Sequence, residues 1–204
     1  MTAELAGCFG PAPPPRGAKW MLSGAIQSGK TTGLERLIHA LRQATPPWRV
    51  GGLVCPGIYH AGSKVACRGY CCLSGESFVL GIRQPLSDDV RESLEQEFGA
   101  GCCHQPGQVV GSWLLFDSGL GRAAAAITQA VKASCDLVVV DEFGPLELDG
   151  RGLRAAVDQA VAAGAPLLLV VRETLVEPVR HLYGEFHLLR VPGEKPPVAR
   201  PDSN

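Results

Sequence analysis

The chain has no excess of charge of either sign and no long apolar run. Its 204 residues include 19 lysines and arginines against 20 aspartates and glutamates, a formal net charge of −1. The basic residues are scattered, so the sequence lacks the electrostatic footprint of a nucleic-acid-binding protein. No apolar stretch approaches the ~20 residues that a transmembrane helix needs. We therefore expect neither a nucleic acid nor a membrane as a partner.

The N-terminus lacks the features of a targeting segment. Leu5-Ala6-Gly7-Cys8 resembles a lipoprotein cleavage box. A signal peptide would place a basic start and an apolar stretch before that box, and the few residues there, which include Glu4, provide neither. The sequence therefore predicts a cytoplasmic protein.

Eight cysteines are present, but they lack the spacing of a typical zinc site. Such sites repeat a C-x₂₋₄-C element, and here Cys67 and Cys71 supply the one gap of that kind apart from the adjacent pairs. In a cytoplasmic chain we interpret the cysteines as reduced, partly buried thiols. Metal binding or redox sensing stays open for the central group, which comprises Cys67, Cys71, Cys72, Cys102 and Cys103.

One stretch carries a specific signal for phosphate binding. Gly24-Ala25-Ile26-Gln27-Ser28-Gly29-Lys30-Thr31, followed by Thr32, fits the phosphate-binding pattern G-x-x-x-x-G-K-[ST]. The glycines allow backbone N–H groups to point at a phosphate, which Lys30 would also reach. The Thr31 hydroxyl would bind Mg²⁺. An apolar, strand-like segment precedes the loop and a helical pattern follows it, so we predict that this loop binds a nucleotide.

A pair of acidic residues follows a buried strand further along the chain. Leu137-Val138-Val139-Val140 is apolar throughout, and Asp141 and Glu142 come directly after it. In open α/β folds this position lies at the carboxyl edge of the sheet, where ligands bind. We expect Asp141 to hold Mg²⁺ with Thr31. We expect Glu142 to activate a water molecule, which favours hydrolysis over transfer to a bulky acceptor.

The remaining pattern predicts a single α/β domain over residues 18–191. Strands alternate with helices there, which predicts a parallel sheet with helices on both faces. Short strand-like runs with glycine-containing gaps predict an inserted β-meander at residues 57–82. Residues 1–17 are expected to form a disordered N-terminal tail, and residues 192–204 a loose C-terminal tail.

The segments between the meander and the second motif are less regular. Leu86 to Phe98 is charged and fits either a helix or a mobile loop. Gly99 to Gln108 is expected to be a surface loop. Val109 to Phe116 is expected to form one strand, and Asp117 or Ser118 to cap an alanine-rich helix that ends near Ser134.

The segment Asp141–Leu148, D-E-F-G-P-L-E-L, resembles the D-E-[I/F]-G-x-[M/L]-E-L signature of a family of small P-loop nucleoside-triphosphatases. This family includes the cancer-related nucleoside-triphosphatase of animals and its thermophile relatives. G-K-T-T at Gly29–Thr32 and V-G-S-W at Val110–Trp113 are similar to the family as well. The resemblance implies a RecA-like, mostly parallel α/β fold with an added hairpin region. It also implies Mg²⁺-dependent hydrolysis of ATP, GTP and other nucleoside triphosphates.

The same resemblance implies roles for individual residues. Lys30 and Thr31 would bind phosphate and Mg²⁺, Asp141 would belong to the metal shell, and Glu142 would be the base. Glu147 would fix the loop that carries it.

The chain departs from the family pattern at Gln27, where many relatives have a glycine, at Arg190–Glu194, where relatives carry an N-R-D-like segment, and after the second strand. Many relatives carry T-x-E-[V/I]-R after the second strand, whereas this chain has Cys55–His60, so an arginine is missing. A cation that stabilises the transition state can raise the rate ~10³-fold or more. Arg172, at the carboxyl end of an apolar strand, is our first candidate for that role. Arg122, Arg68 and Arg180 rank after it.

Two other functions stay open. A small-molecule or nucleotide kinase would share the phosphate-binding loop, although the sequence lacks an arginine-dense lid. A non-enzymatic GTP-binding accessory protein, of the kind that assists molybdopterin guanine dinucleotide assembly, has a similar first strand and G-K-T-T loop. The D-E-F-G-P-L-E-L segment favours the triphosphatase over both.

Overall fold

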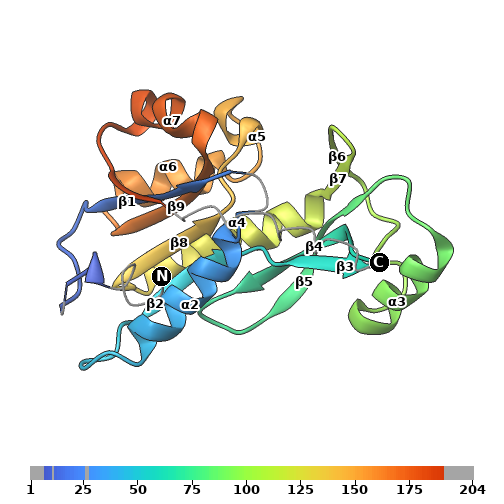
Figure 1. The fold of residues 1–204 in the computed structure, drawn as a ribbon, viewed down its shortest axis with the longest axis horizontal. Coiled ribbons are helices and arrows are strands. Elements are labelled where there is room, and N and C mark those ends of the chain that lie inside the picture. Colours follow the sequence, from blue (N-terminus) through green and yellow to red (C-terminus); the bar gives the residue numbers. More distant parts are fainter. Residues whose placement is uncertain (1–6, 11, 26–27, 191–204) are drawn as a thin grey trace, which may run out of the picture.

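The computed structural model describes residues 7–10, 12–25 and 28–190. Its strands form one mixed sheet in the order β10-β1-β9-β8-β2-β4-β5-β7-β6, and β3 pairs with β4 outside this path (Figure 1). The strands are β1 (Lys19–Gly24), β2 (Val50–Val54), β3 (Gly57–His60), β4 (Ser63–Cys71), β5 (Ser77–Arg83), β6 (Gly107–Val110), β7 (Trp113–Phe116), β8 (Leu137–Asp141), β9 (Leu167–Arg172) and β10 (His187–Arg190). The helices are α2 (Lys30–Arg42), α3 (Asp88–Phe98), α4 (Asp117–Lys132), α5 (Pro145–Leu148), α6 (Arg154–Ala162), the 3₁₀ helix η1 (Glu173–Leu175) and α7 (Val176–Tyr183).

One half of the sheet, β10-β1-β9-β8-β2, is parallel, and we call it the parallel half. Its strands are apolar on both sides because helices cover both faces. On β1, Leu22 packs with Leu34 of α2, whereas its neighbour Met21 packs in the cluster that contains Ile127 of α4. Each fully buried side chain of this size contributes about 1.5–3 kcal/mol. The parallel half therefore holds the two largest clusters of the core.

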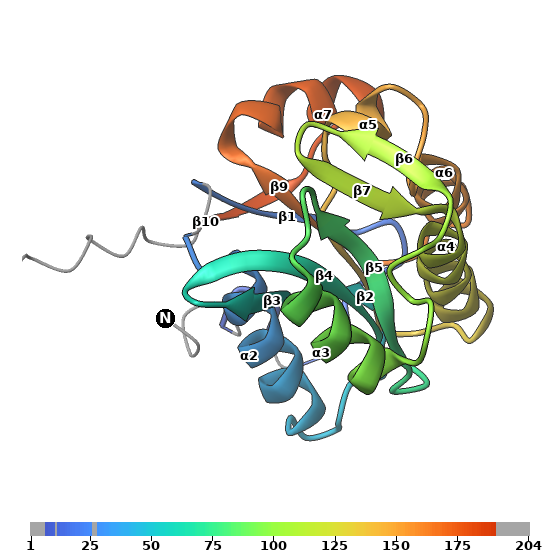
Figure 2. The same cartoon turned by 90° about the vertical axis from the view of Figure 1, so that its right-hand side faces the viewer.

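The other half comprises β4, β5, β7, β6 and β3, whose pairings are all antiparallel, and we call it the antiparallel half. Helix α3 covers it on the side where α2 covers the parallel half (Figure 2). Val90 and Leu94 of α3 are buried there against Ala66, Val79 and Phe116. The charged segment that fitted a helix or a loop is therefore a helix with one apolar stripe.

The predicted α/β class with helices on both faces is confirmed, but the sheet is mixed instead of mostly parallel. The segment Val109–Phe116, which we expected to be one strand, is a hairpin of β6 and β7. Gly111 has φ +59°, and Val110 pairs with Trp113 across the turn. A glycine adopts this left-handed backbone without steric cost, so the chain reverses at a point where strand propensity alone predicts continuation.

Two segments that we expected to be loose make buried contacts. Cys102 and Cys103, in the expected surface loop, are buried in the core cluster of the antiparallel half. Phe9, in the expected N-terminal tail, is buried with its ring centroid 4.8 Å from that of Trp20 and 6.0 Å from that of Trp48. Burial of these apolar side chains outweighs the glycines and prolines around them. Residues 1–6 and 192–204 lie outside the described residues.

Candidate active site

The predicted site residues come from the carboxyl ends of three adjacent parallel strands. β1 pairs with β9, and β9 pairs with β8. In this register Gly24 lies beside Arg172, and Asp141 lies beside Val170. The phosphate-binding loop after β1 and the acidic pair at the end of β8 therefore meet at one edge of the sheet. This edge is where ligands bind in open α/β folds.

The phosphate-binding loop depends on its glycines. Gly29 lies directly before α2 and has φ +79°, a backbone conformation that residues with a Cβ rarely adopt. A Cβ on Gly24 would lie 2.6 Å from Oγ of Ser28. Ser28 is buried, and its Oγ has no hydrogen-bond partner in the described part of the chain. Ile26 and Gln27 lie outside the described residues, and Ala25 and Thr32 occupy the positions that the motif assigns to them.

The Lys30 ammonium lies against this loop. Its Nζ donates to the carbonyl oxygens of Gly24 at 3.0 Å and Ala25 at 2.6 Å. Burial lowers the pKa of Lys30, while the charge of Glu142 acts in the opposite direction. The positive charge is thus held at the start of α2, beside the helix end that favours anions.

Asp141 joins the two motifs. Its carboxyl group is buried and accepts a hydrogen bond from N–H of Cys55 at 3.1 Å. Burial raises the pKa of Asp141 to about 6, although the bond from Cys55 and the Thr31 hydroxyl act to lower this pKa. A carboxylate and a hydroxyl are hard oxygen donors, the ligand type that Mg²⁺ takes. The donor set at Thr31 and Asp141 therefore fits the predicted cation.

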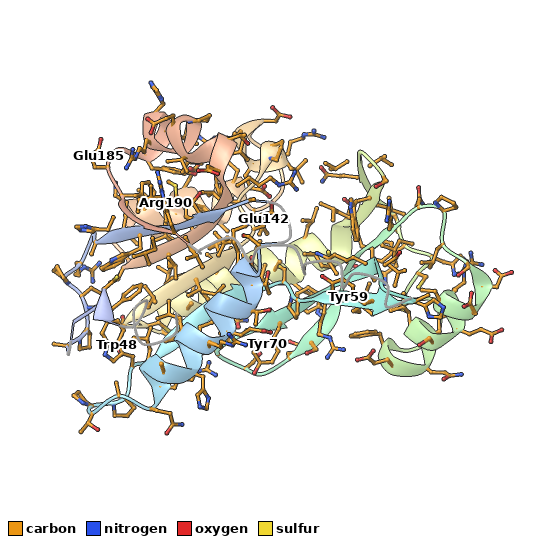
Figure 3. All side chains as sticks on the ribbon, viewed as in Figure 1. Trp48, Tyr59, Tyr70, Glu142, Glu185 and Arg190 are labelled. Atoms are coloured by element: carbon orange, nitrogen blue, oxygen red, sulfur yellow. The ribbon has the colours of Figure 1, made fainter. Side chains whose placement is uncertain are left out.

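Glu142 comes directly after the end of β8. Nε of Arg172 donates to Oε1 of Glu142 at 2.7 Å. Both side chains are about two-fifths exposed, at 40% for Glu142 and 42% for Arg172, so the pair contributes little to stability. Its effect is to orient Glu142, which lies between the parallel strands and the hairpins (Figure 3). The sequence indicated both residues but not their contact.

Glu147 holds the loop after β8. Its Oε2 accepts a hydrogen bond from N–H of Gly144 at 2.8 Å, and its Oε1 accepts one from N–H of Leu153 at 3.2 Å. The carboxyl group is buried and faces backbone donors on both sides. Glu147 therefore stabilises the turn that follows Glu142.

Comparison with known proteins identifies the family. The chain is 32% identical over 159 residues to the nucleoside-triphosphatase THEP1 of Methanopyrus kandleri, a match that spans 78% of this chain and 76% of the relative. This chain belongs to the THEP1 nucleoside-triphosphatase family. A family model described as "Protein of unknown function (DUF2478)" also matches residues 81–194, more than half of the chain.

Two further similarities are informative. The solution structure of a human cancer-related nucleoside triphosphatase superposes with a TM-score of 0.60 at 20% identity, covering 87% of this chain and 90% of that one. It shows that the fold is shared. The molybdenum import ATP-binding protein ModC 2 of Bradyrhizobium diazoefficiens is 31% identical over 130 residues, which are 63% of this chain and 12% of that relative.

Three of the arginines considered for a catalytic role lie in other ion pairs. Arg68 pairs with Glu97, Arg122 with Glu76 and Arg180 with Glu177. Each of these pairs includes a strongly exposed side chain. Of the four candidates, Arg172 is the one that the fold brings to Glu142.

Sequence reasoning missed three residues that interact with Asp141, one directly after β2 and two on β4. Cys55 follows β2 directly, in the segment where this chain departs from the THEP1 family pattern, and Cys67 and Lys64 come from β4. The position of Cys55 after a buried strand was a usable signal. Lys64 and Cys67 gave none, since their place depends on how β3 and β4 pair.

The described cysteines offer no metal centre. No group of three or more His, Cys, Asp or Glu side chains that could hold a metal was found among the described residues. Sγ of Cys102 lies 3.6 Å from Sγ of Cys103 as a thiol contact.

Among the described residues, no helix has both the length and the apolar character needed to cross a bilayer.

Proposed function

We propose that this member of the THEP1 family is a Mg²⁺-dependent enzyme that hydrolyses the γ-phosphate of nucleoside triphosphates. The observation that carries the proposal is the register of β1, β9 and β8, which brings the phosphate-binding loop and the acidic pair, the two motifs of a P-loop hydrolase, to one edge of the sheet. Lys30, Glu142 and Arg172 lie at the same edge of the sheet, close enough to influence one another's charge. A phosphate chain on this loop would contact all of these groups.

The phosphate-binding loop and Lys30 would hold the nucleotide. Backbone N–H groups of the loop and of the first turn of α2 face the phosphates, and the ammonium offsets their negative charge. Thr31 and Asp141 would hold Mg²⁺, which when bound neutralises charge on the β- and γ-phosphates.

Glu142 would accept the proton of the attacking water. Its contact with Nε of Arg172 fixes its direction, and its partial exposure leaves room for a water molecule beside it. General-base catalysis of this kind contributes about 10²–10⁴-fold in rate. Arg172 would act as a positioning residue for Glu142, and its remaining guanidinium donors are available to phosphate oxygens.

Phosphate release from ATP, GTP, CTP and UTP, with Mg²⁺ and with excess EDTA, tests the proposal. We expect slow release that requires Mg²⁺ and is reduced at least ~10²-fold in Lys30→Ala, because the ammonium offsets charge that develops on the phosphates. Lys132→Ala is the matched control, since Lys132 is exposed at the far end of α4. Equal release by Lys30→Ala and Lys132→Ala would contradict the proposal.

The similarity to the molybdenum import protein supports a second candidate function. The chain would then act as a nucleotide-binding accessory module in molybdenum uptake, with hydrolysis as a timer. Phosphate release measured with added molybdate, and with sulfate as the control anion, separates the two. A change in the rate of phosphate release with molybdate but not with sulfate would favour the accessory function. Equal rates with both anions would favour the general triphosphatase.

A further inference from the structure

The side chain of Lys64 reaches toward the active site from the antiparallel half. Lys64 lies near the start of β4 and pairs with Tyr59 of β3. A Cβ on Gly57 would lie 2.9 Å from Cε of Lys64, so the lysine stem crosses the backbone where Gly57 has no side chain. Gly57 comes two residues after Cys55, whose N–H donates to Asp141. The stem therefore runs toward the carboxyl end of β8.

The contacts of the Lys64 ammonium are weak for a charged group. Its Nζ lies 5.4 Å from the ring centroid of Trp113, and the neighbouring thiol of Cys67 acts to raise its pKa. Among the described residues, no carboxylate oxygen was found within 4.0 Å of this nitrogen. A thiol is a poor acceptor, and a half-buried ammonium without an anion carries a cost in free energy.

Electrostatics places the ammonium near the acidic pair. Burial acts to lower the pKa of Lys64, but Cys67, Tyr59 and Glu142 act to raise it, and the net direction is upward. Lys64 in turn acts to lower the pKa of Asp141. The ammonium is thus within electrostatic reach of both carboxyl groups.

Lys64 differs from the other cations around the site. Arg172 contacts Glu142, and the Lys30 ammonium contacts two loop carbonyls. On β4 itself, Arg68 pairs with Glu97 of α3, because a β-bulge between Cys67 and Arg68 changes the register of the strand. Lys64, by contrast, is partly buried, its stem runs toward the acidic pair, and its ammonium contacts no carboxylate among the described residues.

We propose that Lys64 contacts the γ-phosphate of a bound nucleoside triphosphate and stabilises the charge of its transition state. This inference rests on the proposed function of the same site. The γ-phosphate would lie between Lys30 on one side and Lys64 on the other, with Glu142 and its water facing it. The phosphate supplies the anion that the ammonium lacks.

Three variants test this assignment. Lys64→Met keeps the apolar stem and removes the charge, Lys64→Arg keeps the charge, and Arg68→Met is the matched control that removes a cation of the same strand directed toward α3. Equilibrium affinity is measured with Mg²⁺ for a non-hydrolysable triphosphate analogue and for the corresponding diphosphate. Turnover is measured by phosphate release.

We expect Lys64→Met to weaken triphosphate binding about 10-fold while diphosphate binding is unchanged, because a charge-assisted contact to the γ-phosphate is lost. We expect its turnover to fall by about 10²-fold or more. Lys64→Arg should keep the preference for triphosphate over diphosphate, and Arg68→Met should match the wild type in both measurements.

An unchanged preference for triphosphate in Lys64→Met would overturn the assignment. Should Lys64→Met not fold, Lys64→Gln makes the same comparison. If the wild-type protein binds triphosphate preferentially but releases no phosphate, the proposed hydrolysis fails. A loss of the preference in Lys64→Met would then still support the contact. If Lys64→Met hydrolyses triphosphate as fast as the wild type, the proposed function is supported and Lys64 has no role in it.

Discussion

The two halves of the sheet contribute to the site in different ways. In the parallel half, residues that match known motifs follow the strand ends, as Lys30 follows β1 and Glu142 follows β8. In the antiparallel half, Lys64 reaches the site from within a hairpin, across the backbone of Gly57. The parallel half thus carries chemistry common to P-loop hydrolases. The antiparallel half adds a lysine that belongs to neither motif.

The seam between the halves is short. β2 pairs with β4 at only two register positions, Leu53 with Cys71 and Val54 with Tyr70, whereas β1 pairs with β9 at six. Helix α4 packs on both halves, and Gly119 allows it to approach closely, since a Cβ there would lie 3.0 Å from backbone oxygens of β5. The antiparallel half is therefore positioned by helix α4 and by the short pairing of β2 with β4.

The largest expected effect lies in the parallel half. Glu142→Gln should lower kcat by about 10²–10⁴-fold and keep nucleotide affinity, because it removes the proton acceptor but little binding. Arg172→Ala should lower kcat less. In the double variant the two effects should not add, since Arg172 acts through Glu142. Turnover and equilibrium binding of all three variants check this, with the exposed Glu173→Gln as control. Additive losses would show that Arg172 acts on the substrate independently.

Glycine substitutions compare the stability of the two halves. Gly52 has φ +98°, and a Cβ on this residue would lie only 2.1 Å from the backbone oxygen of Val139. Gly52→Ala should therefore lower the free energy of unfolding by about 3–5 kcal/mol. A Cβ on Gly107 would lie 2.2 Å from the oxygen of Leu115, but β6 is an edge strand that can separate locally. Gly107→Ala should therefore lower the free energy of unfolding by only about 1–2 kcal/mol.

Urea unfolding of both variants measures the difference. Gly121→Ala is the control, because a Cβ there meets nothing within 4 Å on the exposed face of α4, and it should stabilise by about 0.5–1 kcal/mol. Equal losses for Gly52→Ala and Gly107→Ala would contradict the expectation that the edge strand β6 relieves its clash more easily than β2.

The last of these effects concerns Asp141 and depends on pH. Burial raises the pKa of Asp141 from 3.8 to about 6, so the native state binds this proton more tightly than the unfolded chain. The resulting stability is present below about pH 4 and is lost as the pH rises through 6. At 1.36 kcal/mol per pKa unit the loss is about 3 kcal/mol.

Asp141→Asn should remove this dependence. The free energy of unfolding is measured in EDTA at pH 4 and at pH 7. It should fall more from pH 4 to pH 7 for the wild type than for Asp141→Asn. Asp149→Asn, at an exposed site, should follow the wild type. Parallel pH profiles for the wild type and Asp141→Asn would show that Asp141 ionises normally.

Much of the parallel half was predictable, since its signals are local. A glycine before α2, an apolar run ending at Asp141 and the alternation of strands with helices each act over a few residues. These signals identified the phosphate-binding loop and the family. The hairpin at Gly111 and the burial of Phe9 were missed, because a left-handed turn and an aromatic cluster depend on residues that the local pattern does not include.

The sequence by itself thus determined the phosphate-binding loop, the acidic pair after β8 and the α/β class, because glycine geometry, strand burial and motif spacing are properties of neighbouring residues. Only the tertiary structure decided that Arg172 contacts Glu142 and that the stem of Lys64 crosses the backbone of Gly57. These contacts arise from strand order and register, which join segments far apart in the chain through the packing of the whole sheet.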